Sequence, residues 1–582
     1  MGDGGVRLET VTVRYPARRT PALENVDVRV SPGERIGIAG RTGAGKSTLA
    51  LTSAGFIPRV VRARVEGAIT IDGVSPLAAA ASELLGRVGI VFSTPANQLS
   101  GSKLTVREEL AFGLENLGMP RDEMDARLEA VMARLRIEHL AGREPFALSG
   151  GEQQRVAIAS IVAMGTRVLI LDEPTAQLDP AGTADITALL GELATDGVTV
   201  MCVEHDPTLL GQMDRVMVLD QGRVVANALP GEALSDRSIE PLGLAAPALV
   251  RLADAAGIPA RRAFDEDAIV EAFRDRRTEH TGATPRVVGA QPAIAAGAAW
   301  RPARERPVPD LVVERLVHDY PGGVEAVRGI DFGVKPGELV AIVGQNGSGK
   351  TTLVKHFNGL LRPASGRILI GGRDTVAEPI HALAALVGFV FQNPDDQLFE
   401  RSVEREIAFG PRSLGIPPTE VRLLVDQAIE ATGLDEVRTS NPYDLDLSRR
   451  KLVGLASVLA TDPAIVVLDE PTTGQDHAGV VRVGGIVASL KAAGRTVIAI
   501  THDMEFAARH FERVVVMRLG EIVADGTPAE VFRAANAELL ASTGLTPPPA
   551  ARIAARLGLD AVPADADELL RILAGRPSPG RA

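Results

Sequence analysis

Cysteine and long apolar stretches are nearly absent from this chain, and each absence restricts what the protein can be. A single cysteine, Cys202, cannot form a disulfide within the chain, and we expect it to pack in a core in a reducing compartment. No stretch reaches the roughly 18 apolar residues that a membrane-spanning helix needs. The N-terminus has no basic region followed by an apolar one, so no signal peptide is expected.

An excess of positive charge is also missing. The formal net charge is −12, which argues against a general nucleic-acid binder. With 45% hydrophobic and 23% charged residues the composition is that of a globular protein, and 582 residues are too many for one core. More than one globular domain is therefore expected.

Two glycine-rich segments match the pattern G-x-x-x-x-G-K-[ST]. The first reads G-R-T-G-A-G-K-S-T from Gly40 to Thr48, and the second reads G-Q-N-G-S-G-K-T-T from Gly344 to Thr352. Each follows a short apolar run, so we expect a loop between a buried strand and a helix N-terminus, where backbone N–H groups attract phosphate. The residues predicted to bind nucleotide in these loops are Gly40, Gly43, Gly45, Lys46, Ser47, Thr48, Gly344, Gly347, Gly349, Lys350, Thr351 and Thr352.

Acidic pairs end a second apolar run downstream of each loop. Asp172-Glu173 follows V-L-I-L, and Asp469-Glu470 follows I-V-V-L. An aspartate at the end of a strand beside such a loop is expected to bind Mg²⁺ together with the hydroxyl of Ser47 or Thr351, and the glutamate after it can polarise the attacking water.

Histidine and tyrosine residues recur at matching places in the two halves. His205 and His502 each end a β-branched-rich run and precede an aspartate, which favours a contact with the γ-phosphate. Tyr15 and Tyr320 each precede a proline near the start of a half, where the ring can stack on adenine or serve as an ordinary strand aromatic.

The segment L-S-G-G-E, which begins at Leu148, predicts a helix N-terminus. Ser149 is a natural N-cap with Glu152 three residues later, and Gly150 and Gly151 leave backbone N–H groups open to an anion. Because the glycine-rich loop already provides this half with a phosphate site, Ser149, Gly150 and Gly151 are expected to serve a phosphate held elsewhere.

These ordered motifs resemble those of ATP-binding cassette (ABC) ATPases over most of the chain. The resemblance implies an α/β fold with two tandem P-loop nucleotide-binding domains, each with an α-helical subdomain and a small C-terminal helical extension. It also implies ATP hydrolysis with ATP and Mg²⁺ as cofactors. In that family two domains pack head-to-tail, so that each ATP lies between the P-loop of one domain and the L-S-G-G of the other.

The second half departs from the family pattern. It carries L-S-R-R-K from Leu447 to Lys451, which pairs Ser448 with Ser149 and sets Arg449 and Arg450 in place of the two glycines. The glutamine that the family uses as a Mg²⁺ ligand and as a link to its membrane partner is Gln392, and Ser93 stands in its place in the first half.

Assigned to head-to-tail sites, these departures fall in one pocket. The site with Lys350, Gln392, Glu470 and His502 takes the intact Ser149-Gly150-Gly151. The site with Lys46, Glu173 and His205 takes both departures. We therefore expect one strict and one degenerate site, although the arginines can also pair with phosphate oxygens directly.

Similar tails follow the two halves and give the expected domains. These are an ATPase domain at 6–235 with an extension at 236–274, a linker at 275–308 rich in Pro, Gly, Ala and Arg, and an ATPase domain at 309–540 with an extension at 541–576.

A narrower resemblance rests on F-Q-N-P-D-D-Q-L-F from Phe391 to Phe399 and the S-V-E-R-E-I-A-F-G that follows. It is similar to the ATPases of energy-coupling-factor (ECF) importers of vitamins and transition-metal ions. The resemblance implies two separate partners at the cytoplasmic face of the membrane, an integral-membrane coupling protein and a small substrate-binding membrane protein. Nucleic acid and the transported substrate are not expected as contacts.

Two other classes remain open at this point. A tandem ATPase of a sugar-type importer shares the motifs but not the P-D-D-Q string. A soluble ABC translation factor would carry a charged helical linker and basic surfaces, unlike this acidic chain. The sequence does not identify the transported substrate.

Overall fold

The structure is a computed structural model that describes residues 5–16, 18, 20–176, 178–242, 244–278, 300, 307–321 and 323–575. Two compact units make up the chain. Unit 1 comprises Met1–Val250 and Pro259–Phe264, and unit 2 comprises Arg251–Ile258 and Asp265–Ala582. The chain expected as a linker, 275–308, lies largely outside the described residues.

Unit 1 contains two sheets. A three-stranded antiparallel sheet has the order β2-β1-β4, and a six-stranded sheet has the order β5-β6-β7-β3-β8-β9, in which only the edge strand β9 is antiparallel. Their bounds are β1 Val6–Arg14, β2 Leu23–Val30, β3 Arg35–Gly40, β4 Arg64–Ile71, β5 Val88–Val91, β6 Val168–Asp172, β7 Thr199–Val203, β8 Arg215–Asp220 and β9 Arg223–Ala228.

Unit 2 repeats this arrangement. Its antiparallel sheet has the order β11-β10-β13-β14, and its six-stranded sheet has the order β15-β16-β17-β12-β18-β19. The bounds are β10 Leu311–Tyr320, β11 Val324–Val334, β12 Leu339–Val343, β13 Ser365–Ile370, β14 Arg373–Asp374, β15 Val387–Val390, β16 Ile465–Asp469, β17 Thr496–Ile500, β18 Arg513–Arg518 and β19 Glu521–Gly526. We call the two repeats cassette one and cassette two.

The burial of each strand follows from its place in the sheets. The central parallel strands β7, β12, β16 and β17 are buried at every residue, and they read as unbroken apolar runs because helices or strands cover both faces. The antiparallel strand β2 alternates between buried and exposed residues. One core joins the two sheets of each cassette and includes Leu49 in cassette one and Leu353 in cassette two.

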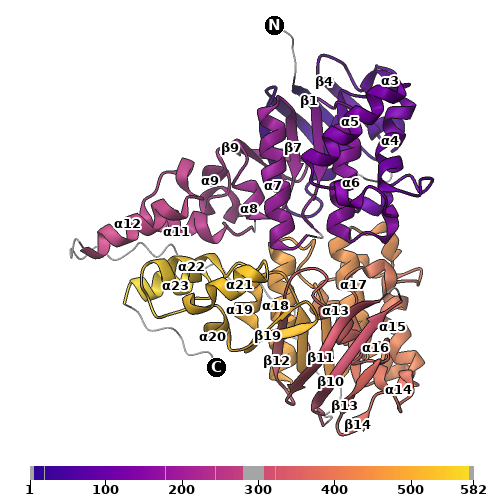
Figure 1. Cartoon of the computed structure of the whole chain (residues 1–582), viewed down its shortest axis with the longest axis vertical. Helices are drawn as coiled ribbons and strands as arrows, with labels where there is room; N and C mark the ends of the chain where they lie inside the picture. The colour runs from indigo at the N-terminus through magenta and orange to yellow at the C-terminus, as the bar shows by residue number, and fades with distance from the viewer. Residues whose placement is uncertain are drawn as a thin grey trace. The chain divides into compact units, whose positions relative to one another are not determined.

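Helices cover the sheets and form a separate subdomain in each cassette (Figure 1). In cassette one α4, α5 and α6 pack together, and in cassette two α15, α16 and α17 do the same. The helices other than α11, α12, α22 and α23 are α1 Lys46–Ser53, α2 Phe56–Arg59, α3 Ala81–Leu84, α4 Val106–Asn116, α5 Arg121–Arg134, α6 Gly150–Ala163, α7 Pro180–Thr195, α8 Pro207–Leu210, α9 Pro230–Ala233, α10 Asp236–Ile239, α13 Lys350–Lys355, α14 Ile380–Ala384, α15 Val403–Ser413, α16 Pro418–Thr432, α17 Leu447–Leu459, α18 His477–Ala492, α19 Met504–His510, α20 Pro528–Val531 and α21 Ala537–Ser542.

The extension helices are α11 Ala248–Ala256, α12 Glu266–Thr278, α22 Pro549–Arg556 and α23 Ala566–Leu573. Within unit 2, Arg251 pairs with Asp567 at the start of α23, and Arg552 pairs with Glu266 at the start of α12. Carboxylates are favourable in the first turn of a helix, so these pairs combine two attractions. The stretch 236–274, expected as one extension of the first domain, is thus divided between the two compact units.

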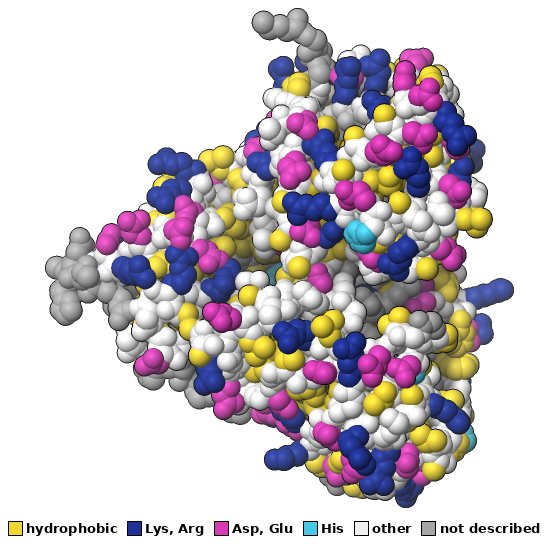
Figure 2. Space-filling view, in the orientation of Figure 1, with side chains coloured by type: hydrophobic (Ala, Val, Ile, Leu, Met, Phe, Trp, Pro, Cys, Tyr) yellow, Lys and Arg dark blue, Asp and Glu magenta, His cyan; other side chains and the backbone are white. Residues whose placement is uncertain are grey.

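Among the residues that the structure describes, no helix is both long and apolar enough to span a membrane. Figure 2 shows Lys and Arg side chains interspersed with Asp and Glu side chains over both units on the visible face.

Glu505, in the first turn of α19, is a buried carboxyl group with two other carboxylates nearby. Burial, together with the nearby carboxylates of Asp503 and Asp565, raises the pKa of Glu505 from its ordinary value of 4.5 to about 8, against the opposing charges of Arg509 and Arg251. The folded chain therefore holds this proton more tightly than the unfolded chain does. The free energy of unfolding consequently falls as the pH rises from 4.5 to about 8.

We predict that Glu505→Gln raises the thermal unfolding midpoint at pH 9, where the parent carries a buried charge, and changes it little at pH 5. Scanning calorimetry of both proteins at the two pH values measures this. A gain at pH 5 as large as the gain at pH 9 would show that the charge of Glu505 is not the cause.

Candidate nucleotide sites

Each P-loop lies between a central strand and a helix, as the sequence predicts. The first connects β3 to α1 and the second connects β12 to α13. Gly45 and Gly349 cap these helices with φ of 105° and 96°, and a Cβ atom there would lie 2.5 Å from the Ala22 oxygen and 2.2 Å from the Ala326 oxygen. Only glycine fits at these two positions.

The P-loop lysines are buried and point back into their own loops. The Lys46 Nζ donates to the main-chain oxygens of Gly40 and Arg41 at 2.9 and 3.0 Å. The Lys350 Nζ donates to the oxygens of Gly344 and Gln345, both at 2.7 Å. An ammonium held at the mouth of the loop is placed to meet phosphate oxygens.

Hydroxyl and carboxylate groups meet beside each P-loop. The Ser47 Oγ lies 3.2 Å from the Asp172 Oδ1, and the Thr351 Oγ1 lies 3.2 Å from the Asp469 Oδ2. Burial and the neighbouring glutamate raise the pKa of Asp172 and of Asp469 to about 6. Oxygen donors with uncompensated negative charge suit Mg²⁺, so these pairs fit the expected metal.

Glutamate and histidine are paired in both cassettes. The His502 Nε2 lies 2.9 Å from the Glu470 Oε1, and the His205 Nε2 lies 3.4 Å from the Glu173 Oε1. Burial acts to raise the pKa of each glutamate, but its histidine and the nearby lysines together leave the pKa below its ordinary value. Each glutamate is therefore held as a carboxylate.

The two tyrosines lie at the P-loop helices. The Tyr15 hydroxyl is 3.2 Å from the Thr48 Oγ1, and the Tyr320 hydroxyl is 3.2 Å from the Thr352 Oγ1. The structure thus brings together Tyr, Lys, Ser or Thr, Asp, Glu and His in each cassette, in the combination that the sequence predicts.

Glu204 is a residue of this region that the sequence analysis missed. It is buried directly before His205 and accepts hydrogen bonds from the main-chain N–H groups of His205 at 2.6 Å and Asp206 at 3.1 Å. Burial and the Asp206 carboxylate raise the pKa of Glu204. A charged residue inside the apolar run V-T-V-M-C-V-E-H was the available signal. Thr501 takes this place in cassette two and accepts from Asp503 N–H instead.

Helix α6 presents its N-terminus as the sequence predicts. Ser149 caps the helix by accepting from Glu152 N–H, and the Glu152 side chain accepts from Ser149 N–H at 2.8 Å. Gly150 and Gly151 form the first turn with no side chain over their N–H groups. Such a terminus can accept an anion.

The register assumed for L-S-R-R-K is wrong. Val168 begins β6 and Ile465 begins β16, an offset of 465 − 168 = 297 residues. The same offset pairs the N-cap Ser149 with Asp446, because α6 begins at Gly150 and α17 begins at Leu447. Matching the letters L-S instead shifted the comparison by two residues.

Cassette two therefore has Asp446, Leu447 and Ser448 where cassette one has Ser149, Gly150 and Gly151. Ser448 is not the N-cap but lies in the first turn of α17, buried, with its Oγ 2.7 Å from the Gln475 Oε1. Arg449 and Arg450 follow in the helix, and Arg450 pairs with Asp395 at 2.5 Å. A count back from the downstream strand would have found this register from the sequence.

The glutamine loops also differ between the cassettes. Gln392 is exposed, and no hydrogen bond within the described part of the chain ties its side chain to Thr351 or Asp469. Gln397, five residues later, accepts from Phe391 N–H and donates to the Gly454 oxygen of α17 at 2.8 Å. Gln98 in cassette one accepts from Phe92 N–H but donates to β5, at the Ile90 oxygen. Among the hydrogen bonds of the described residues, this glutamine ties its loop to the following subdomain helix in cassette two, at α17, but not in cassette one, at α6.

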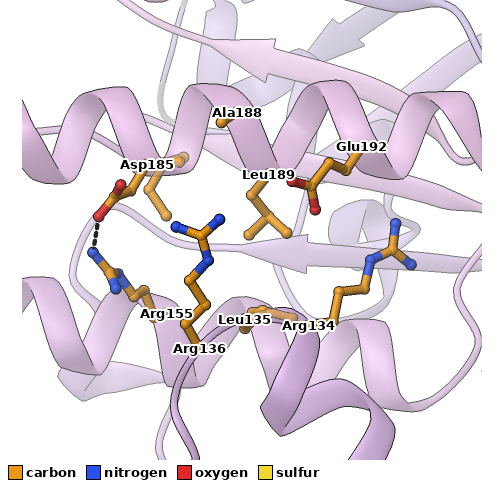
Figure 3. Close-up of a pocket in the computed structure, with 9 residues that line it drawn as sticks. Arg134, Leu135, Arg136, Arg155, Asp185, Ala188, Leu189 and Glu192 are labelled. Atoms are coloured by element: carbon orange, nitrogen blue, oxygen red, sulfur yellow. Dashed lines mark hydrogen bonds and ion pairs between the residues drawn. The ribbon is translucent and has the colours of Figure 1, made fainter.

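A cavity of about 50 Å³ lies away from these groups, between α5, α6 and α7 (Figure 3). Arg155 of α6 and Asp185 of α7 form an ion pair in it, while Arg136 projects from the end of α5 toward α7. No residue of the P-loop or of the acidic pair lines this cavity. It is not part of the candidate nucleotide site.

Several known proteins resemble this chain. A solved structure of cbiO1 from Clostridium perfringens, described as part of the ABC transporter complex cbiONQ, is 37% identical, covers 40% of this chain and 93% of its own, and has a TM-score of 0.36. A protein of Methanosarcina acetivorans, provisionally described as an ABC transporter ATP-binding protein, is 38% identical over 95% of this chain and 91% of its own. A similarly described protein of Caldanaerobacter subterraneus is 32% identical over 96% of this chain and 97% of its own.

The ABC transporter family model matches residues 23–176 and 327–473, one segment in each cassette. The matched segments contain the P-loop and the acidic pair of each cassette. The chain belongs to the ABC transporter family, as an ATPase with two ATP-binding cassettes in tandem.

Proposed function

We propose that this ATPase powers an importer of the energy-coupling-factor type, which takes up vitamins or transition-metal ions. A coupling protein and a small substrate-binding protein, both integral to the membrane, are separate chains in this proposal. The ATPase binds them at the cytoplasmic face and never touches the transported substrate. The observation that carries the proposal is the F-Q-N-P-D-D-Q-L-F segment, which ends in an exposed aromatic cluster.

The aromatic patch of cassette two consists of Phe399, Phe409 and Tyr443. Their exposed fractions are 56%, 45% and 50%. The rings of Phe399 and Phe409 meet edge to face with centroids 4.7 Å apart, and the Tyr443 hydroxyl donates to the main-chain oxygen of Leu398. Exposed aromatic clusters mark interaction sites, and an amphipathic helix of a membrane partner is a fitting occupant.

Cassette one carries a related patch at the same offset of 297 residues. Phe112 corresponds to Phe409 (409 − 112 = 297), and Phe146 corresponds to Tyr443 (443 − 146 = 297). Phe112 and Phe146 are exposed by 40% and 49%. Two similar patches support binding of two related helices of one coupling protein.

In the proposed mechanism the cassettes close head-to-tail around two nucleotides. The site of Lys350, Glu470 and His502 receives Ser149, Gly150 and Gly151. The site of Lys46, Glu173 and His205 receives Asp446, Leu447 and Ser448. At that second site a carboxylate at the helix cap repels phosphate, and Leu447 covers the N–H groups that glycine leaves open. In addition, Ser93 stands where the other cassette has Gln392, so this site lacks the glutamine as well. This site is therefore the degenerate one.

At the strict site each group has one task. Lys350 and the P-loop N–H groups hold the phosphates, and Thr351 and Asp469 would hold Mg²⁺, which supplies charge neutralisation when bound. Glu470 polarises the attacking water, while His502 keeps its carboxylate oriented. Gln392 senses the filled site, and the tie from Gln397 to α17 carries that signal through the helical subdomain beside the aromatic patch.

The proposal predicts that the tagged full chain, purified from detergent-solubilised membranes of its native host, brings down two integral-membrane proteins, one of them small. Phe409→Glu combined with Phe112→Glu should lose both partners while ATP binding is kept, because charge in an apolar interface costs several-fold in affinity or more. Val225→Glu, a change at an exposed apolar residue away from the patches, is the control.

Mass spectrometry of the purified material separates the classes. Ribosomal proteins as the main partners, or membrane subunits of a sugar importer with a separate solute-binding protein, would refute the proposal. So would retention of the same partners by the double glutamate variant.

The head-to-tail arrangement predicts that Gly150→Asp stops hydrolysis at the Lys350 site, although that site lies in the other cassette. The new carboxylate repels the γ-phosphate at closure, and turnover should fall about 10²-fold or more. Fluorescent ATP should still bind the open form. Quenched-flow hydrolysis in a chain whose other site is silenced by Glu173→Gln measures the effect.

As a control, Asp446→Ser, Leu447→Gly and Ser448→Gly give cassette two the Ser-Gly-Gly sequence of cassette one in the same chain. This change should not rescue Gly150→Asp, because those residues serve the other nucleotide. Full hydrolysis at the Lys350 site in the Gly150→Asp protein would disprove the sharing of sites.

A further inference from the structure

Helix α17 makes a contact in cassette two that helix α6 does not make in cassette one. The side chain of Lys451 is buried beneath the end of β16, with only 7% of the residue exposed. Its Nζ donates to the main-chain oxygen of Glu470 at 2.9 Å. Lys451 and Glu470 also line one small cavity, together with Asp469 and Gln475.

The carbonyl that Lys451 holds belongs to a strained turn. Glu470 has a φ of 50°, in the left-handed region that glutamate seldom adopts, and Glu173 has a φ of 53°. The Glu470 N–H donates to the Ile500 oxygen at 3.0 Å. Both main-chain polar groups of Glu470 are therefore tied, one to β17 and the other to α17, and the direction of its side chain follows from that turn.

Cassette one offers a natural comparison at the same position. Gln154 follows the N-cap Ser149 by five residues, as Lys451 follows Asp446. Gln154 is buried, but within the described residues its Nε2 has no hydrogen-bond partner. Glu173 N–H donates to the Val203 oxygen at 2.9 Å, and the Glu173 carbonyl accepts from Ala176 N–H of its own loop at 3.3 Å. The Glu–His distance is also longer there, 3.4 Å against 2.9 Å.

The start of α17 is anchored on the same side of cassette two. The Gln475 Nε2 donates to the Ser448 oxygen at 3.1 Å, and Arg450 pairs with Asp395 in the glutamine loop. The helix that carries Lys451 is thus fixed to the segment after β16 and to the loop after β15. A charge carried on this helix has a defined position relative to Glu470.

We propose that Lys451 is a positioning residue of the cassette-two hydrolysis site, whose buried ammonium holds the Glu470 carbonyl and so fixes the turn that aims the Glu470 carboxylate at the reacting water. This rests on the role of Glu470 proposed above. Helix α17 lacks the Ser-Gly-Gly start that can bind phosphate. In this proposal it instead supports the glutamate of its own cassette.

The test is steady-state ATP hydrolysis by the full chain in a Glu173→Gln background, where the remaining turnover comes from the Lys350 site. Lys451→Met keeps the apolar stem and removes the donor. Lys451→Gln introduces the residue that cassette one accommodates at this position. Each should lower kcat about ten-fold or more, as expected for a lost hydrogen bond from a charged donor, and leave KM for ATP within about two-fold.

Two controls separate positioning from packing. Gln154→Met, at the equivalent place in cassette one, should leave kcat unchanged. Val453→Ala removes buried volume from the same helix, so it should lower the unfolding midpoint without the loss of kcat.

The inference is overturned if Lys451→Met and Lys451→Gln both retain parental kcat, or if Val453→Ala lowers kcat as much as they do. Glu470→Gln in the same background tells this failure from a failure of the proposed role of Glu470. If Glu470→Gln leaves turnover intact, the role of Glu470 itself is wrong. If it abolishes turnover while the Lys451 variants do not, only the role of Lys451 is wrong.

Discussion

Two carboxylates, Asp469 and Glu470, are buried side by side at the carboxyl end of β16, where their negative charges repel each other. Burial of adjacent like charges is costly unless cations or hydrogen bonds compensate it. The surrounding groups supply that compensation. Thr351 bonds Asp469, His502 bonds Glu470, and Lys350 and Lys451 bring positive charge from the P-loop and from α17. What remains uncompensated at Asp469 is the negative charge that a divalent cation would meet.

Cassette one shares this arrangement but compensates it less completely. Its acidic pair has Ser47, His205 and Lys46, while Gln154 stands where Lys451 stands in cassette two. A further buried acid, Glu204, lies directly before His205, and burial together with the Asp206 carboxylate raises its pKa. The phosphate-binding helix start, in contrast, is intact in cassette one. Cassette one has Ser149-Gly150-Gly151 there, and cassette two has Asp446-Leu447-Ser448. If sites are shared head-to-tail, the better-supported glutamate and the intact signature meet at the same nucleotide.

Local chemistry made much of this predictable from the sequence. The P-loops, the acidic pairs and the histidines each follow a mainly apolar strand, and parallel strands bring such ends to one edge of a sheet. Matching letters did not give the register of α17. Leu447-Ser448 has the same two letters as Leu148-Ser149, but the N-cap of α17 is Asp446. The contacts of Lys451 and Gln397 join segments far apart in the sequence, and no local pattern reports them. The division of the stretch 236–274 likewise depends on ion pairs with the last helices of the chain.

In the proposed mechanism the two sites are unequal, with hydrolysis concentrated at the site of Lys350 and Glu470. The most direct measurement compares ATP turnover by the full chain after Glu470→Gln and after Glu173→Gln, with ATP binding followed in parallel. We expect Glu470→Gln to lower turnover about 10²-fold or more with binding intact, and Glu173→Gln to leave most of the turnover in place. Equal losses from the two substitutions would show that the two sites are equivalent.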